Sequence, residues 1–273
     1  MEKFVQCRKC LNKNVSLKSG KPIVPPGFIV EQTTPKGSLQ PTDTVRECEC
    51  HLAWRKKHEL EVSAKSASLS PQWIDYDLSK DYVGTESKDN VTRIINYVEL
   101  SNQDDLPNDV KERLKAAVLY LYGTNGTQKT TIANWMGYQF LKAKKSVKYI
   151  LMNDLIKMLQ KAERDDSIMA KLEKLEDVDL LLIDEAFDKE KVTIYKSNFQ
   201  VPFLDSFLRS RMQTKHKGII FISNISPYDI EAKGFNYSIQ DLVVRNMNKE
   251  KGFMEFKDRY DSIKSTVDTN TLF

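Results

Sequence analysis

Residues 123–131 read GTNGTQKTT and stand between an apolar run and a stretch with helical spacing. The pattern is close to G-x-x-x-x-G-K-[ST], in which a glycine-bearing loop joins a strand to a helix. In such a loop, backbone N–H groups and the positive end of the following helix converge on the phosphates of a nucleotide. The sequence therefore predicts a phosphate-binding loop with a strand–loop–helix unit around it.

The side chains of this loop have distinct expected roles. Lys129 brings a positive charge toward the β and γ phosphates, and the Thr130 hydroxyl is a ligand for Mg²⁺. Gln128 stands where the pattern usually has glycine, so its side chain must point away from the phosphates or the loop must shift. The residues expected to contact ATP or ADP are Gly123, Thr124, Asn125, Gly126, Thr127, Gln128, Lys129, Thr130 and Thr131.

Four short apolar runs follow residue 115, and stretches with helical spacing separate them. The runs are residues 117–122, 147–152, 178–183 and 218–223. Apolar strands that alternate with helices are typical of a parallel sheet covered on both faces. This part of the chain is therefore predicted to be an α/β domain, with a parallel sheet flanked by helices.

Polar residues follow two of these runs directly. Asp184 and Glu185 end the third run, and Asn224 follows the fourth. The carboxyl ends of parallel strands meet at the edge where such sheets bind ligands, beside the loop after the first strand. We expect Asp184 to hold Mg²⁺ through water, Glu185 to orient the attacking water, and Asn224 to hold that water near the γ-phosphate.

The cysteines of the chain, which number four, all lie in its first fifty residues, as Cys7, Cys10, Cys48 and Cys50. Clustered cysteines in a reducing compartment more often bind metal than form disulfides. Each short pair presents two thiolates from one turn, and two turns together give a tetrahedral sulfur site for zinc. His51 remains an alternative ligand to the second pair. The glycines and prolines between the pairs favour a small, hairpin-rich zinc ribbon.

Composition and charge exclude several other classes. Hydrophobic residues make up 40% of the chain and charged residues 29%, as in folded soluble proteins. The longest apolar run, residues 116–122, is far shorter than the roughly 20 residues that span a membrane. The first residues lack the apolar core of a signal peptide, so we expect a cytoplasmic protein. Residues 1–70 hold 12 Lys and Arg against 7 Asp and Glu, which permits contact with nucleic acid or an acidic partner.

The phosphate loop, LLLIDE, a helix ending in LRSRMQTKHKG, and IIFISN follow one another in this order. Together they resemble the AAA+ ATPase domain of bacterial and phage replicative helicase loaders of the DnaC/DnaI type, over roughly residues 110–260. The GTQKT version of the loop is more similar to phage members. Transposition-helper ATPases of the IstB type share this core. The cysteine arrangement is similar to the small zinc-binding domains with which several loaders grip the helicase.

The resemblance implies roles for further residues. Arg245 matches the arginine finger of the family, which reaches the γ-phosphate of a neighbouring subunit. Arg211, or Arg209, is expected near the nucleotide or that subunit. Residues 153–175 correspond to a helical element of initiators and loaders, which implies binding of single-stranded DNA. Its basic residues that could follow the phosphate backbone are Lys157, Lys161 and Arg164.

These expectations give a chain of three parts. Residues 1–68 form a zinc-binding domain that contacts a helicase, residues 69–109 form a linker and a docking helix, and residues 110–273 form the AAA+ domain with a polar tail. The expected function is ATP-dependent delivery of a hexameric replicative helicase to single-stranded DNA, with self-association through the ATPase domain. Two alternatives stay open, namely a transposition-helper ATPase and a nucleotide-gated adaptor with little turnover, which the glutamine at 128 would favour.

Overall fold

A computed structural model of the chain describes residues 7–8, 10, 25–33, 42–188, 200–247 and 252–259. Its contacts divide the chain into two units, Met1–Ser63 and Ala64–Phe273, and the division falls within helix α2 (Glu49–Ala67). The boundaries expected after residues 68 and 109 stay predictions. The polar tail expected after residue 260 lies outside the described residues. No helix in the described ranges has both the length and the apolar character needed to cross a membrane.

The larger unit contains a five-stranded sheet in the order β4-β5-β6-β3-β7, and each neighbouring pair is parallel. The predicted α/β class with a parallel sheet is confirmed. The sequence did not reveal β7, because this strand has only three residues and includes an acid. The strands are β3 (Val118–Tyr122), β4 (Val147–Leu151), β5 (Leu180–Asp184), β6 (Gly218–Ser223) and β7 (Phe253–Glu255).

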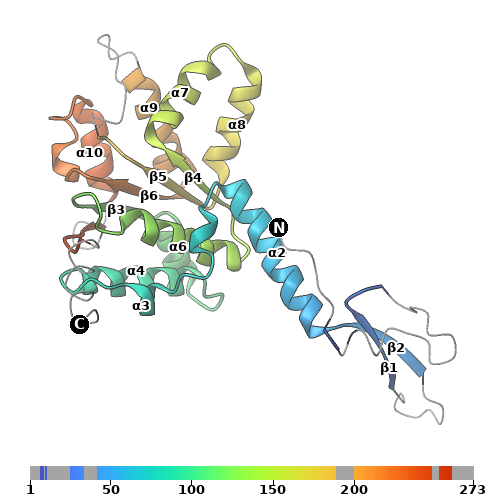
Figure 1. Cartoon of the computed structure of the whole chain (residues 1–273). Coiled ribbons are helices and arrows are strands. Elements are labelled where there is room, and N and C mark those ends of the chain that lie inside the picture. The colour runs from blue at the N-terminus through green and yellow to red at the C-terminus, as the bar shows by residue number, and fades with distance from the viewer. Residues whose placement is uncertain are drawn as a thin grey trace, which may run out of the picture. The chain divides into compact units, whose positions relative to one another are not determined.

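Helices cover both faces of this sheet, with α3, α4 and α6 on one side and α7 to α10 on the other (Figure 1). Short turns η1 (Pro71–Trp73), η2 (Ser210–Lys215, π-helical) and η3 (Pro227–Asp229) join them. The helices are α3 (Leu78–Asp81), α4 (Lys88–Ser101), α5 (Asn108–Lys115), α6 (Lys129–Lys142), α7 (Met152–Ala162), α8 (Asp166–Asp177), α9 (Gln200–Arg209) and α10 (Tyr237–Asn246).

Side chains of strand β5, which lies between β4 and β6, alternate between these two helical layers. Leu181 and Ile183 belong to the core that α7 to α10 cover, whereas a methyl group of Leu182 lies close to Gly137 of α6. Because successive side chains of a strand point to opposite faces, Asp184 points to the same side as Leu182. The last residue of β5 therefore lies on the face that α6 covers.

The smaller unit consists of an antiparallel hairpin, β1 (Phe28–Thr33) with β2 (Thr42–Glu47), followed by the start of α2. The N–H of Cys48 donates to the carbonyl of Gly27 at 2.8 Å and joins the two ends of the hairpin. Gly27 has a φ of +91°, and a Cβ there would lie 2.4 Å from the His51 ring, so only glycine fits. The hairpin and its cysteines fit the predicted zinc-ribbon-like domain.

Arg211 corrects one sequence prediction. Its side chain is fully buried at the amino-terminal ends of β5 and β6, opposite to the edge where the phosphate loop lies. Its guanidinium donates at 2.7–3.0 Å to the carbonyl oxygens of Leu175, Glu176, Val178 and Gly218. The expected contact between Arg211 and the nucleotide is therefore wrong, and the residue instead joins α8 to the sheet.

Asp258, just after β7, anchors the chain segment before α4. Its side chain is 8% exposed and accepts four hydrogen bonds, from the N–H groups of Thr85, Glu86 and Ser87 and from the hydroxyl of Tyr82. Burial by itself would raise the pKa of Asp258, but these backbone donors outweigh burial and lower the pKa to about 2. The carboxylate also complements the positive end of α4.

We predict that Asp258→Asn destabilises the larger unit, because one carboxylate oxygen is replaced by a donor facing other donors. The expected loss is about 1–3 kcal/mol, or several degrees of melting temperature. The ordinary pKa of 3.8 falls to about 2 on folding, so the stabilisation by the carboxylate is full above pH 4 and is lost as the pH falls through 2. The melting temperatures of the wild type and of Asp258→Asn should therefore approach each other as the pH falls toward 2. Asp105→Asn, at an exposed position, is the control, and equal melts at pH 7 for wild type and Asp258→Asn would contradict the prediction.

Candidate nucleotide-binding site

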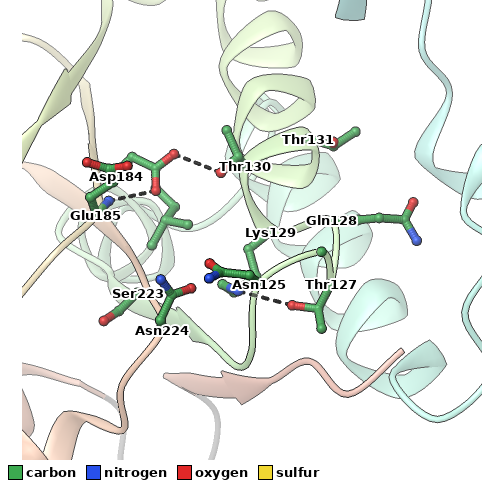
Figure 2. Close-up of a pocket in the computed structure, with 12 residues that line it drawn as sticks. Asn125, Thr127, Gln128, Lys129, Thr130, Thr131, Asp184, Glu185, Ser223 and Asn224 are labelled. Atoms are coloured by element: carbon green, nitrogen blue, oxygen red, sulfur yellow. Dashed lines mark hydrogen bonds between the residues drawn. The ribbon is translucent and has the colours of Figure 1, made fainter. Parts of the chain in front are cut away.

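A pocket of about 260 Å³ lies at the carboxyl edge of the sheet, beside the loop that follows β3 (Figure 2). Strand β6 lies between β3 and β5, so the ends of three neighbouring strands meet there. This is the edge at which parallel α/β sheets bind ligands. The pocket is lined by Asn125, Gly126, Thr127, Gln128, Lys129, Thr130, Thr131, Asp184, Glu185, Ile222, Ser223 and Asn224.

The loop after β3 surrounds the ammonium group of its own lysine. Lys129 Nζ donates to the carbonyl oxygens of Gly123 and Thr124, at 2.8 Å each, and to Thr127 Oγ1 at 3.0 Å. Lys129 is 6% exposed, so these oxygens compensate for the burial of its charge. Gly123 has no room for a side chain, since a Cβ would lie 2.1 Å from the Phe256 carbonyl oxygen. The lysine is therefore positioned at the centre of the predicted phosphate loop.

Asp184 joins the end of β5 to the first turn of α6. Its Oδ2 atom accepts a hydrogen bond from the Thr130 hydroxyl at 2.8 Å, and its Oδ1 atom accepts one from the N–H of Glu185 at 2.7 Å (Figure 2). The two residues expected to bind Mg²⁺ are thus in direct contact. A hydroxyl and a carboxylate are the oxygen donors that Mg²⁺ prefers, so this pair fits the ion.

Tyr149 of β4 is a residue of this site that sequence reasoning missed. Its hydroxyl donates to Asp184 Oδ2 at 2.6 Å, beside the hydrogen bond from Thr130. A tyrosine in an apolar strand indicates core packing, and only the pairing of β4 with β5 brings it to the carboxylate.

Gln128 has the left-handed backbone conformation, with φ 62° and ψ 11°, at the residue before α6. This conformation explains why glycine usually occupies the position. Figure 2 shows the side chain pointing away from the other labelled pocket residues, which is the first of the two possibilities set out above. Its Nε2 atom is buried and has no hydrogen-bond partner in the described part of the chain. Glu185, across the pocket, also has a positive φ of 53°.

Ser223 and Asn224, at the end of β6, line the pocket between the phosphate loop and the acids Asp184 and Glu185. The Ser223 hydroxyl donates to the carbonyl of Ala186 at 2.6 Å, and Asn224 Nδ2 donates to Asp188 Oδ2 at 3.1 Å. Both bonds run toward the segment that follows β5. Asn224 therefore lines the pocket, together with the loop and the acids, as its position in the sequence suggests.

Arg245 and Arg209 lie outside the pocket lining. Arg245, on α10, has a side chain that is 72% exposed and donates through Nε to Asp241 Oδ1 at 2.6 Å. Arg209, at the end of α9, donates to Asp205 Oδ2 at 3.0 Å and to Ser238 Oγ at 2.6 Å. The exposed guanidinium of Arg245 is accessible to a second molecule, and its role as an arginine finger stays a prediction.

The basic residues proposed for DNA contact share the solvent face of α7 and the turn after it. Leu155, Ile156 and Leu159 fill the buried face of that helix. The exposed residues are Lys157, Lys161 and Arg164. Their contact with a phosphate backbone stays a prediction.

The cysteine sulfurs of the smaller unit come together as a possible metal site. The four Sγ atoms lie within 4.8 Å of one another, with separations of 3.5 Å for Cys7–Cys10, 3.8 Å for Cys7–Cys48 and 3.0 Å for Cys10–Cys50. Zinc bonded to four sulfurs at about 2.3 Å places them about 3.8 Å apart, so the cluster fits zinc. His51, the alternative ligand, lies outside this cluster, and its Nδ1 atom is 2.6 Å from Glu47 Oε1.

We predict that Gln128→Gly stabilises the larger unit, because it removes both a left-handed side-chain-bearing residue and a buried amide without a partner. A gain of about 1 kcal/mol, or 2–4 °C in a thermal melt, is expected, without loss of nucleotide affinity. Lys144→Gly is the matched control, since Lys144 has a φ of 61° at the end of α6. That control should gain less than Gln128→Gly. A lower melting temperature for Gln128→Gly would contradict this account of the loop.

Two comparisons of sequence bear on the site. The family model of IstB-like ATP binding proteins matches residues 110–192, which include the phosphate loop and the acids after β5. No curated protein matches the chain.

Solved structures share the fold. A replication initiator DnaA bound to AMPPCP and single-stranded DNA superposes with a TM-score of 0.54 at 20% identity, over 75% of this chain and 57% of that one. For DnaI the TM-score is 0.52 at 17% identity, over 69% and 94% of the two chains. For the DnaC helicase loader it is 0.50 at 16% identity, over 69% and 100%. This chain thus covers little more than half of the DnaA structure, but nearly all of the DnaI and DnaC structures. Residues 110–192 are therefore similar to IstB-like ATP binding proteins, and the chain shares the fold found in DnaI and DnaC.

Proposed function

We propose that this protein is an ATP-dependent loader, which binds a hexameric replicative helicase and delivers it to single-stranded DNA during replication. The observation that carries the proposal is the combination, in one chain, of a nucleotide pocket on the DnaI and DnaC fold with a separate four-cysteine cluster. Such a loader acts where DNA is replicated, so the proposed location is the bacterial cytoplasm, that of the host if a phage encodes the protein.

The pocket residues divide the chemistry of ATP hydrolysis among them. Lys129 would exchange the loop carbonyls for oxygens of the β and γ phosphates. Thr130 and Asp184 would hold Mg²⁺, which supplies positive charge against the phosphates. Glu185 would orient the attacking water and Asn224 would hold it, so that the bond from the γ-phosphorus to the β–γ bridging oxygen breaks and ADP and phosphate leave.

Self-association would complete this site. The side chain of the proposed finger, Arg245, is exposed and does not line the pocket of its own chain. Its ion pair with Asp241 holds the guanidinium on α10, in a position that a neighbouring subunit could meet. A guanidinium supplied in this way neutralises charge in the transition state and links hydrolysis to assembly. Lys157, Lys161 and Arg164 would then contact single-stranded DNA, as exposed charges of one helix and its following turn.

The cysteine unit is the proposed helicase-binding part, with zinc as its structural metal. Among its described residues, the buried core consists of Cys10, Ile29 and Cys48, each at most 2% exposed, and a bound metal would add to the stability of this cluster. Backbone and side-chain hydrogen bonds from Cys10 lower the pKa of Cys7 to about 6, whereas burial raises the pKa of Cys10 and of Cys50. Zinc would therefore displace protons from the buried thiols when it binds.

A second candidate function is suggested by the family match. IstB-like proteins give their name to the model that covers residues 110–192, so a transposition-helper ATPase that assembles on duplex DNA shares this core. The separate cysteine cluster favours the loader. The third possibility, an adaptor with little turnover, is disfavoured by the presence of both acids and of Asn224 around the pocket.

The test is capture of a purified hexameric replicative helicase by the full-length chain, in the presence of zinc and ATP. Cys10→Ser should lower the zinc content and the captured helicase together, while the nucleotide affinity stays that of the wild type. Glu31→Gln is the control within the same unit, because it removes an exposed ion pair with Arg46 and leaves the cysteines intact.

The outcomes separate the two candidates. Helicase capture that depends on zinc supports the loader. Capture that persists in Cys10→Ser after zinc is lost would contradict the role of the cysteine unit. Absence of capture under every condition, together with ATP-dependent assembly on duplex DNA, would overturn the loader and favour the transposition helper.

A further inference from the structure

The pairing of β4 with β5 brings a tyrosine to the proposed magnesium-binding acid. Tyr149 is opposite Leu182 in the register, and Leu151 is opposite Asp184. Ile150 belongs to the core beneath α7 to α10, so its neighbour Tyr149 faces the α6 side, as Asp184 does. The tyrosine lies two residues before the position opposite Asp184, and the length of its side chain bridges that offset to place the hydroxyl 2.6 Å from Oδ2.

The Asp184 carboxylate is largely occupied by donors of the protein. Two hydroxyls, from Thr130 and Tyr149, donate to Oδ2, and the N–H of Glu185 donates to Oδ1. A carboxylate offers about four acceptor positions, so these three bonds fix both its plane and its rotation and leave about one position, on Oδ1. The side chain is only 7% exposed, and these donors compensate for its burial away from water.

We propose that Tyr149 is a positioning residue for magnesium, which orients the Asp184 carboxylate so that its remaining acceptor position and the Thr130 hydroxyl face the ion together. This inference rests on the proposed ATP-binding function and deepens it. Outer partners of this kind hold the groups around a metal in place, and their removal typically lowers metal affinity by 10–100-fold. Without the phenol, the carboxylate would keep a single donor on Oδ2 and could rotate away from Thr130.

Tyr149 contributes both a ring that fills space and a hydroxyl that donates to the carboxylate, 2.6 Å from Oδ2. A phenylalanine at this position would fill the same space without the hydrogen bond, so the two contributions can be separated by one substitution.

The test is Tyr149→Phe in the full-length chain, with binding of a fluorescent ATP analogue measured as a function of Mg²⁺ concentration. We expect the Mg²⁺ concentration at half-maximal binding to rise about tenfold, while the affinity in EDTA stays within twofold of the wild type. Tyr97→Phe is the matched control, because Tyr97 is also buried and its hydroxyl donates to the Leu114 carbonyl at 3.3 Å, outside the pocket lining. That control should leave the Mg²⁺ midpoint unchanged.

Each other outcome has a definite meaning. A Mg²⁺ midpoint for Tyr149→Phe within twofold of the wild type would overturn the inference and leave the tyrosine as packing. A lower midpoint would also overturn it, because the phenol would then compete with the ion. An equal rise of the Mg²⁺ midpoint in Tyr97→Phe would also overturn the inference, because the effect would then come from the loss of any buried hydroxyl. Absence of nucleotide binding by the wild type would instead contradict the proposed function itself.

Discussion

The hydrogen bond between Thr130 and Asp184 is the contact on which the rest of the site depends. It joins α6, the helix that follows the phosphate loop, to the end of strand β5, with 2.8 Å between Thr130 Oγ1 and Asp184 Oδ2. This hydrogen bond can form only if Asp184 lies on the face of β5 that α6 covers. The alternation of Leu181, Leu182 and Ile183 along the strand places it on that face. Strand β6 lies between the two motifs, so Asn224 also reaches the pocket.

The phosphate loop, residues 123–131, is held partly by contacts of its own lysine. Lys129 is held by oxygens of its own loop, which a phosphate would have to displace. Gln128 and Glu185, on opposite sides of the same pocket, both have a left-handed backbone conformation. This conformation raises the free energy of the folded chain by about 1 kcal/mol or more at each residue. Strain of this kind persists at a site where the surrounding structure enforces it. The side chain of Gln128 points away from the other labelled residues of the pocket (Figure 2).

Sequence alone predicted four of the five strands and most of the residues that line the pocket, because short apolar runs and the spacing of the phosphate-loop motif are local signals. It failed for Arg211, since a basic residue in a helical stretch gives no sign of the backbone carbonyls that will surround it. It also missed Tyr149 and Asp258, whose partners lie 35 and more than 170 residues away in the chain. Such contacts depend on the order of strands in the sheet, which the local pattern does not specify.

The most direct measurement is calorimetric titration of ATP with Mg²⁺ into the wild type, Lys129→Ala and Arg245→Ala, followed by phosphate release. If residues 123–131 bind phosphate, Lys129→Ala loses affinity by about a hundredfold, because a buried charge-assisted contact is gone. Arg245→Ala, outside the pocket lining, should bind ATP as the wild type does but release phosphate more slowly. Unchanged ATP affinity in Lys129→Ala would contradict the assignment of the loop.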